Sequence, residues 1–341
     1  MTFLTRPRLL TFAIAIAGAA LFVALGLPLP LLLGPMAACL GAALLGTRMQ
    51  DAGTLGTFMR TFLGVAVGSS ITPETVGHLS DFALSLLFVP LFVGVIGLVG
   101  YPLFRFVFGF NHPTAWYAAM PGGLQDMLVF GAEAGGDVRA LSLIHATRIL
   151  VIVTAAPLIM ALYWGIDLTQ HPGKPALETD PVQIALMIFA CVAGWKIAER
   201  VGLFGASILG PMILTGALSL AGIITTRPPA EIIWAAQFFI GIAVGVKYCG
   251  ITWRELRADV AAGVAYALLL AAISLAFFEL IYLSGLAPAL NAFLAFLPGG
   301  QAEMVVIAII AGADLAYVVS HHLLRLILVI LLAPVMARLL R

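Results

Sequence analysis

Closely spaced apolar segments decide the class of this chain. They lie near 9–26, 29–46, 57–72, 81–108, 114–135 and 138–163, and again near 181–199, 203–224, 231–249, 260–284, 288–312 and 315–338. Between the two groups stands one polar stretch, DLTQHPGKPALETDP, at 167–181. The chain is 62% hydrophobic and 10% charged, whereas soluble domains carry about 25% charged residues. It cannot bury that much apolar surface within itself, so the sequence predicts an all-α integral membrane protein.

Several other classes of protein are disfavoured by the composition. The net charge is +1, which gives no reason to expect a nucleic-acid partner. Cys39, Cys191 and Cys249 lie far apart in apolar runs, without the spacing of a metal site or a disulfide framework. The basic, apolar N-terminus resembles a signal peptide, but its long apolar run and the segments that follow favour a first spanning helix. We expect no catalytic set, metal or cofactor, so the chain is not expected to be an enzyme.

Short motifs recur in the two halves of the chain. LLGPM at Leu32–Met36 returns as ILGPM at Ile208–Met212, and GVAVG at Gly64–Gly68 returns as GIAVG at Gly241–Gly245. PGG at Pro121–Gly123 returns at Pro298–Gly300. The Gly-x-x-x-Gly motifs predict close approach of helices. The LGPM motifs predict either a helix irregularity or the start of a helix.

The match around PGG continues without a gap. The paired residues are Met127 and Met304, Asp137 and Asp314, His145 and His322, Arg148 and Arg325, and Pro157 and Pro334. A constant offset of 177 residues indicates internal duplication. The sequence therefore predicts a first membrane repeat at 1–164, a periplasmic linker at 165–180 and a second membrane repeat at 181–341.

The positions of the basic residues decide between two topologies. Suppose that each half crosses the membrane about five times and that one of its segments is re-entrant. The residues then on the N-terminal side are Arg6, Arg8, Arg48, Arg60, Arg105, Arg139, Lys196, Arg200, Lys247, Arg254, Arg257, Arg338 and Arg341, against Lys174 and Arg227 opposite. Six crossings per half would distribute the basic residues over both sides of the membrane. The positive-inside rule thus predicts inverted repeats with both termini cytoplasmic.

The PGG segments are the natural candidates for the broken or re-entrant helices. Proline removes a backbone donor and the glycines loosen the chain, and in lipid each freed polar group needs a partner. Transporters with inverted repeats use such breaks to bind solutes. We therefore expect Pro121, Gly122, Gly123, Pro298, Gly299 and Gly300 to contribute to a substrate site. The alternative is a simple packing kink.

Each break is followed by polar side chains. Asp126 and Glu303 are candidates for carrying a coupling proton or binding a cation, and the alternative is that they cap free amides at the helix start. Gln125 and Gln301 are candidate hydrogen-bonding partners of a substrate, although they are one position out of register between the repeats.

A second pair of motifs is HATR at His145–Arg148 and HLLR at His322–Arg325. His and Arg three residues apart share a helix face, and Asp137 and Asp314 resemble N-caps of these helices. Each Arg lies eleven residues from its cap, or about 16 Å at the helical rise. This depth approaches the middle of a hydrocarbon core about 30 Å thick.

Arginine at that depth needs a partner. We predict that Arg148 and Arg325 line a central anion site and that His145 and His322 handle coupling protons. The alternative is a structural role, in which the two Arg side chains pair with Asp126 and Glu303. His321 has no counterpart in the first half, where Ile144 stands.

The paired LGPM motifs, the paired PGG motifs followed by an acid and Met, and the paired AG-x-D motifs resemble the AbrB-duplication membrane proteins of bacteria. The resemblance covers both repeats. Members of that family are described as regulators of gene expression, as ammonia monooxygenases or simply as membrane proteins. At superfamily level the family is similar to inverted-repeat carriers such as cation:proton antiporters and bile-acid symporters. The resemblance implies a polytopic helical fold in the bacterial inner membrane and carries no assigned site residues.

Three functions remain open at this point. The first is a secondary transporter that moves a small organic anion or polar solute by alternating access, with H⁺ or Na⁺ as a coupling ion. The second is a membrane sensor that influences gene expression without binding DNA. The third is a membrane monooxygenase, for which the required metal-ligand spacing is missing. The expected partners are the lipid bilayer and a small-molecule substrate, and a homo-oligomer stays open.

Overall fold

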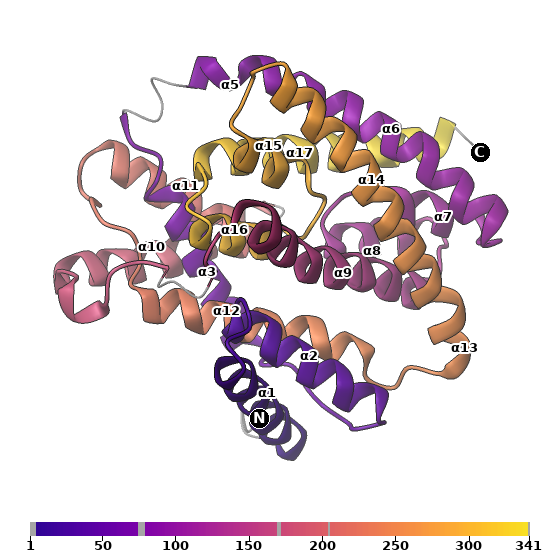
Figure 1. The fold of residues 1–341 in the computed structure, drawn as a ribbon, viewed down its shortest axis with the longest axis horizontal. Coiled ribbons are helices and arrows are strands. Elements are labelled where there is room, and N and C mark those ends of the chain that lie inside the picture. The colour runs from indigo at the N-terminus through magenta and orange to yellow at the C-terminus, as the bar shows by residue number, and fades with distance from the viewer. Residues whose placement is uncertain (1–4, 74–78, 169–171, 204, 340–341) are drawn as a thin grey trace. The chain divides into compact units, whose positions relative to one another are not determined.

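The computed structural model describes residues 5–73, 79–168, 172–203 and 205–339, and the side chains of residues 79–81, 125, 338 and 339 also lie outside the description. Within these ranges every regular element is a helix (Figure 1). The prediction of an all-α chain is therefore confirmed.

Among the described residues, seven helices are long and apolar enough to cross a membrane. They span Arg6–Ala24, Phe82–Val107, Val138–Trp164, Pro181–Arg200, Ala230–Tyr248, Trp253–Leu283 and Leu315–Ala337. Shorter apolar helices cover Pro30–Leu44, Ala206–Leu220 and Gln301–Ile310. Since about 20 apolar residues span a bilayer, these helices have the composition of a multi-pass membrane protein, as the sequence predicts.

The described chain divides into two compact units that cut across the sequence repeats. Unit 1 comprises Met1–Gly77, Ala156–Ile251 and Val305–Ala316, and unit 2 comprises His78–Ala155, Thr252–Met304 and Tyr317–Arg341. Each half of the sequence thus contributes its first helices to unit 1 and most of its later helices to unit 2, while the end of α9 (Val138–Trp164) and most of α16 (Gln301–Ile310) belong to unit 1. The repeats at 1–164 and 181–341 are a division of the sequence, whereas the units are a division of the packing.

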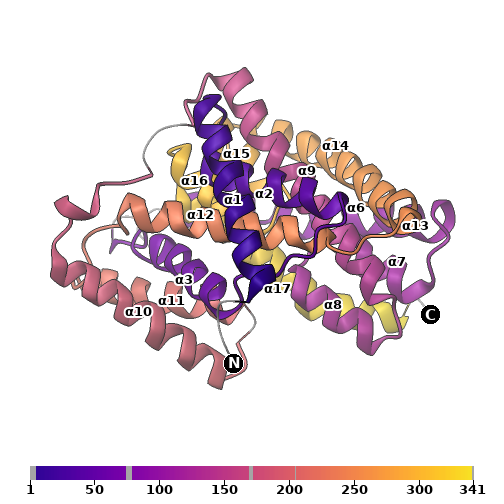
Figure 2. The ribbon, with the colours of Figure 1, turned by 90° about the horizontal axis from the view of Figure 1, so that it is seen from below.

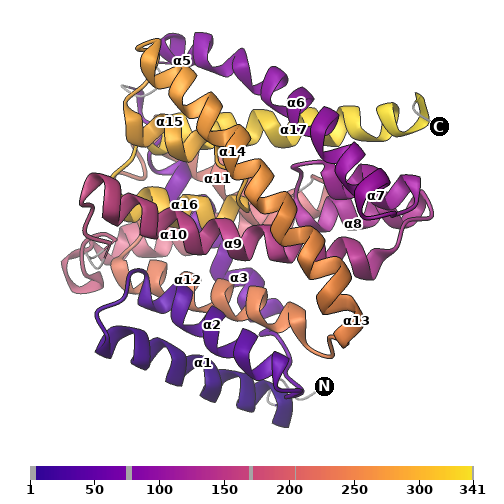
Figure 3. The same cartoon turned by 45° about the vertical axis from the view of Figure 1, so that its right-hand side comes forward.

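Unit 1 contains three helices from each half. These are α1 (Arg6–Ala24), α2 (Pro30–Leu44) and α3 (Thr54–Gly68), and α10 (Pro181–Arg200), α11 (Ala206–Leu220) and α12 (Ala230–Gly245). In Figure 3, α1, α2 and α12 lie side by side, and in Figure 2, α3, α11 and α10 do so. The two halves therefore interleave, because α2 packs on α12 and α3 packs on α11.

Glycine makes this interleaving possible. A Cβ atom on Gly68 of α3 would lie 2.6 Å from the carbonyl oxygen of Met212 in α11, and one on Gly245 of α12 would lie 2.8 Å from that of Met36 in α2. Each Gly-x-x-x-Gly motif thus packs on the LGPM motif of the other half. The predicted close approach is confirmed, and α2 and α11 continue through Pro35 and Pro211.

Unit 2 contains the equivalent helices of the two halves, α6 (Phe88–Pro102) and α14 (Ala261–Leu283), packed against each other. The ring centroids of Phe92 and Phe277 are 5.1 Å apart, and those of Phe104 and Tyr266 are 4.8 Å apart. From the first pair to the second, the residue number rises from Phe92 to Phe104 and falls from Phe277 to Tyr266, so the two segments run antiparallel. An inverted repeat requires such a relation for this pair, and the inverted arrangement of the whole chain stays a prediction.

The first PGG segment joins two short helices, α7 (His112–Ala119) and α8 (Leu124–Glu133), into a hairpin. The Asp137 backbone N–H, just beyond α8, donates to Thr114 Oγ1 near the start of α7 at 2.8 Å. The rings of Tyr117 and Phe130 face each other midway, with centroids 6.3 Å apart. The chain therefore reverses direction at the break, and the end of α8 lies beside the start of α7.

The long helices of unit 2 carry the residues that surround the breaks. These helices are α9 (Val138–Trp164) and α17 (Leu315–Leu339), and the second break lies between α15 (Ala289–Phe296) and α16 (Gln301–Ile310). Asp137 Oδ1 accepts hydrogen bonds from the backbone N–H groups of Arg139 and Ala140 at 2.9 and 3.0 Å. This confirms Asp137 as the cap of α9, whereas for Asp314 the structure gives only its place directly before α17.

Candidate functional site

The candidate site is built on the two PGG breaks of unit 2. Met120–Gly123 separates α7 from α8, and Leu297–Gly300 separates α15 from α16. Met120 and Leu297, each the first residue after a helix, have extended backbones with ψ of 129° and 121°. Their carbonyl groups therefore leave the helical hydrogen-bonding pattern, and inside a membrane such groups must find other donors.

Arginine supplies these donors at both breaks in the same way. Arg148 of α9 donates from Nη1 to Met120 O at 3.4 Å and from Nη2 to Gly122 O at 3.1 Å. Arg325 of α17 donates to Leu297 O and to Gly299 O, both at 3.2 Å. The two sets of partners keep the 177-residue offset. We call each Arg with its two carbonyl partners a clamp.

The clamps use backbone carbonyls as hydrogen-bond acceptors, and the Arg–carboxylate pairing considered from the sequence stays a prediction. In the described residues, the hydrogen bonds of both guanidinium groups go to backbone carbonyls. Met120 O and Leu297 O lie at the C-terminal ends of α7 and α15, where the helix dipole is negative, and Gly122 O and Gly299 O lie within the breaks. Arg148 and Arg325 therefore hold the broken backbone in place, while their side chains are only 1% and 3% exposed.

The histidines hold the same short helices one turn earlier. His145 Nε2–H donates to Tyr117 O at 3.1 Å, and His322 Nε2–H donates to Leu294 O at 2.9 Å. A carbonyl can only accept, so each ring carries its proton on Nε2. Both rings are buried. A proton-coupling role for His145 and His322 stays a prediction.

The two clamps belong to one electrostatic site. The charges of Arg148 and Arg325 interact with each other and with the Tyr266 hydroxyl, and Glu303 interacts with Arg148. Each guanidinium group keeps one buried donor without a partner among the described residues, namely Nε–H. Two like charges that interact with each other and carry unsatisfied N–H groups favour a negatively charged ligand.

The acids lie over the starts of their own helices. A Cβ atom on Gly123 would lie 2.5 Å from Asp126 Oδ2, and one on Gly300 would collide with the Glu303 carboxylate. Asp126 is in the first turn of α8, and Glu303 is in the first turn of α16. This position fits the capping alternative, since carboxylates stabilise helix N-termini. Their proposed coupling role stays a prediction.

The remaining predicted residues lie at or beside the breaks. Pro121, Gly122, Pro298 and Gly299 are buried, whereas Gly123 and Gly300 are partly exposed at the starts of α8 and α16. Gln301 begins α16, and its Nε2 is buried without a partner among the described atoms. Gln125 is in α8, but its side chain lies outside the described part of the structure.

Tyr266 escapes sequence reasoning, whereas the sequence marks His321 only by its lack of a counterpart in the first half. Tyr266 of α14 donates its hydroxyl hydrogen to Ala119 O, the last carbonyl of α7. His321 bonds to Tyr317 O at 2.8 Å and to Ser85 Oγ at 3.0 Å. Tyr266 sits in an apolar run without any motif around it, so only the presence of a buried hydroxyl could have drawn attention to it.

Helices broken at equivalent positions, a buried pair of arginines and long apolar helices define a multi-pass membrane protein with a duplicated polar centre. The family model described as "Transition state regulatory protein AbrB" matches residues 31–341. The chain belongs to this AbrB family, as its motifs suggest.

Two relatives extend the comparison. The chain is 28% identical over 334 residues to "Putative regulator AbrB" of Escherichia coli (strain K12), covering 93% of this chain and 91% of the relative. It is 27% identical over 300 residues to "Uncharacterized protein YhjN" of Bacillus subtilis (strain 168), covering 82% and 76%. No solved structure matches the chain.

Proposed function

We propose that the protein is a secondary transporter that moves a small organic anion across the bacterial inner membrane by alternating access. Arg148 and Arg325 attract the anionic group of the solute. The broken segments at Pro121–Gly123 and Pro298–Gly300 place backbone groups and helix N-termini beside it. Helix N-termini favour anions because their amide dipoles point toward the ligand.

One observation carries the proposal: the paired clamps each retain an unsatisfied, buried Nε–H. A purely structural arginine would be expected to use its donors on protein groups, because buried unpaired donors cost free energy. In these clamps the Nη atoms fix the guanidinium planes, and the Nε–H groups remain for a solute or for water. A carboxylate is the chemical group that matches such donors.

The surrounding architecture supports the same proposal. The α7–α8 hairpin and the antiparallel α6–α14 pair are features that inverted-repeat transporters combine with broken helices. His145, His322, Asp126 and Glu303 surround the breaks and are the proposed coupling groups for H⁺ or Na⁺.

The test is uptake into proteoliposomes with radiolabelled mono- and dicarboxylates supplied one at a time. For a solute that the native protein accumulates, Arg148→Lys and Arg325→Lys should each lower uptake at least about tenfold, since lysine cannot reproduce the planar fork of arginine. Arg257→Lys is the matched control, because Arg257 is exposed on the π-helical turn η4 (Leu256–Val260).

Folding of each variant is checked by gel filtration and thermal melting in detergent. If folded Arg148→Lys and Arg325→Lys proteins transport a solute as fast as the control does, the arginines do not bind it. If no carboxylate is transported while an uncharged solute is, the anion proposal is wrong.

A second candidate function is a membrane sensor that influences gene expression. The name of the Escherichia coli relative favours it, because that protein is described as a regulator. A sensor would bind its ligand at the same clamps and signal through a partner. Transcriptional changes that follow Arg148→Lys in the cell, without any change in solute uptake, would favour this candidate.

A further inference from the structure

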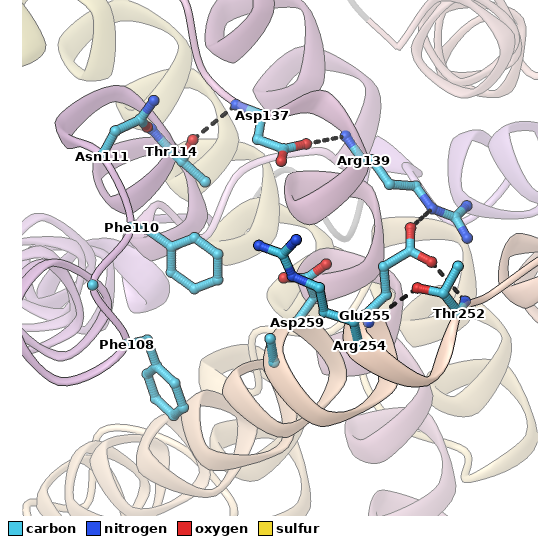
Figure 4. Close-up of a pocket in the computed structure, with 12 residues that line it drawn as sticks. Phe108, Phe110, Asn111, Thr114, Asp137, Arg139, Thr252, Arg254, Glu255 and Asp259 are labelled. Atoms are coloured by element: carbon cyan, nitrogen blue, oxygen red, sulfur yellow. Dashed lines mark hydrogen bonds and ion pairs between the residues drawn. The ribbon is translucent and has the colours of Figure 1, made fainter.

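A second polar pocket lies in unit 2 where several helices begin. It has a volume of about 680 Å³ and is lined by residues from the α7, α9 and α13 starts (Figure 4). Helix α13 (Trp253–Glu255) continues through η4 into α14. The charged residues of the lining are Asp137, Arg139, Arg254, Glu255 and Asp259.

Three of these five charged side chains are already engaged. Asp137 caps α9 through its Oδ1 atom. Glu255 accepts from Arg139 Nε through Oε1 at 2.6 Å, and from the Thr252 backbone N–H through Oε2 at 2.7 Å. Arg139 and Glu255 therefore neutralise each other and tie the start of α9 to the start of α13.

Asp259 and Arg254 remain. Asp259 is only 9% exposed, yet no hydrogen bond or ion pair to its carboxylate is found within the described residues. Arg254 is exposed and likewise makes no ion pair with a described acid, Asp259 included. The pocket thus presents one charge of each sign without a hydrogen bond or ion pair among the described residues, and the charge of Arg254 acts on Asp259. Asp259 is buried, where a carboxylate without a direct partner is costly.

The remaining lining is apolar and aromatic. Figure 4 shows the rings of Phe108 and Phe110 across the pocket from the α13 side chains. Aromatic faces accept cationic groups and apolar side chains. A ligand that satisfies all of these groups carries an ammonium group, a carboxylate and an apolar substituent.

We propose that this pocket binds a small zwitterion of the amino-acid type, with its ammonium group on Asp259 and its carboxylate on Arg254. The Thr114 and Asn111 side chains stand on the same wall as Phe110 and add polar contacts. This site is separate from the clamps, and the inference goes beyond the proposed transport of an anion.

The test is calorimetric titration of the detergent-purified full-length protein with three matched probes. L-leucine carries both charges, 3-methylbutylamine lacks the carboxylate, and 4-methylpentanoate lacks the ammonium group. Leucine should bind at least about tenfold more tightly than either analogue, the effect of one hydrogen bond to a charged group. Asp259→Asn and Arg254→Gln should each weaken leucine binding by a similar factor.

Arg257→Gln is the control, since Arg257 is exposed on the same turn and does not line the pocket. Equal affinity for leucine and 3-methylbutylamine would overturn the zwitterion proposal and leave a cation site. Absence of saturable leucine binding, or leucine binding that survives both substitutions, would overturn the site altogether. Binding is measured without transport, so this outcome is independent of the test of the clamps.

Discussion

In unit 1 the two halves of the sequence meet through glycine, whereas in unit 2 the broken helices are held by arginine and histidine. Gly64 and Gly68 of α3 lie against the α11 backbone, and Gly241 and Gly245 of α12 lie against α2. In unit 2, Arg148 and Arg325 donate to carbonyls that no helix satisfies. Continuous helices need only close packing, but broken helices need donors. This difference is the reason why the proposed solute site is placed in unit 2.

The largest effect is expected when one clamp is removed from unit 2, which tests directly whether the broken helices depend on arginine. Arg148→Met leaves Met120 O and Gly122 O buried without their donors, at a cost of about 2–6 kcal/mol for two acceptors. We expect a large fall in the melting temperature in detergent and a low yield of folded protein.

Arg257→Met supplies the control for the loss of an exposed arginine. Because the clamps are equivalent, Arg325→Met should behave like Arg148→Met. A folded Arg148→Met protein with the native melting temperature would show that the break does not depend on the clamp.

The stability of unit 1 should depend on the size of the side chains at its helix contacts rather than on hydrogen-bond donors. A Cβ atom on Gly64 would collide with the Ile208 carbonyl oxygen, so Gly64→Ala should destabilise the protein by about 1–3 kcal/mol through overpacking. Gly41 in α2 has nothing within 4 Å of a built Cβ atom, so Gly41→Ala should be neutral or stabilising by up to about 1 kcal/mol. Thermal melting of both variants checks the contrast, and equal melting temperatures would contradict it.

The smallest expected effect is the loss of a single hydrogen bond in unit 2. Tyr266→Phe removes a single donor from Ala119 O and should cost about 1 kcal/mol. Tyr282→Phe is the matched control, because Tyr282 lies on the same helix and is 50% exposed. If both variants melt together, the Tyr266 hydrogen bond contributes nothing measurable.

The sequence predicts the pairs of residues but not their partners. The 177-residue offset pairs Arg148 with Arg325 and His145 with His322, and the Gly-x-x-x-Gly motifs predict close packing of helices. The donors bind backbone carbonyls, however, and a carbonyl belongs to every residue, so no residue type marks it. Carboxylate partners can be predicted from a sequence because Asp and Glu are distinct residue types.

The pocket at Asp259 is hidden for a different reason. Phe108 and Asp259 are far apart in the chain, and only the folding of unit 2 brings the starts of α7, α9 and α13 around one space. The basic residues nearby are seen from sequence only as topology markers. Which charges neutralise each other, and which remain, depends on side-chain geometry.

The clamps also bear on the order in which the molecule can assemble. Arg148 reaches carbonyls only 28 and 26 residues earlier in the chain, and Arg325 repeats both separations. Each clamp can close as soon as its own half has been synthesised. The packing of α3 on α11 must wait for the second half, as must the bond from Trp116 to Ala333, which are 217 residues apart. A half-length chain would therefore already contain the arginine and both carbonyl partners of one clamp. An ancestor with a single repeat, before the duplication, would have needed such a clamp.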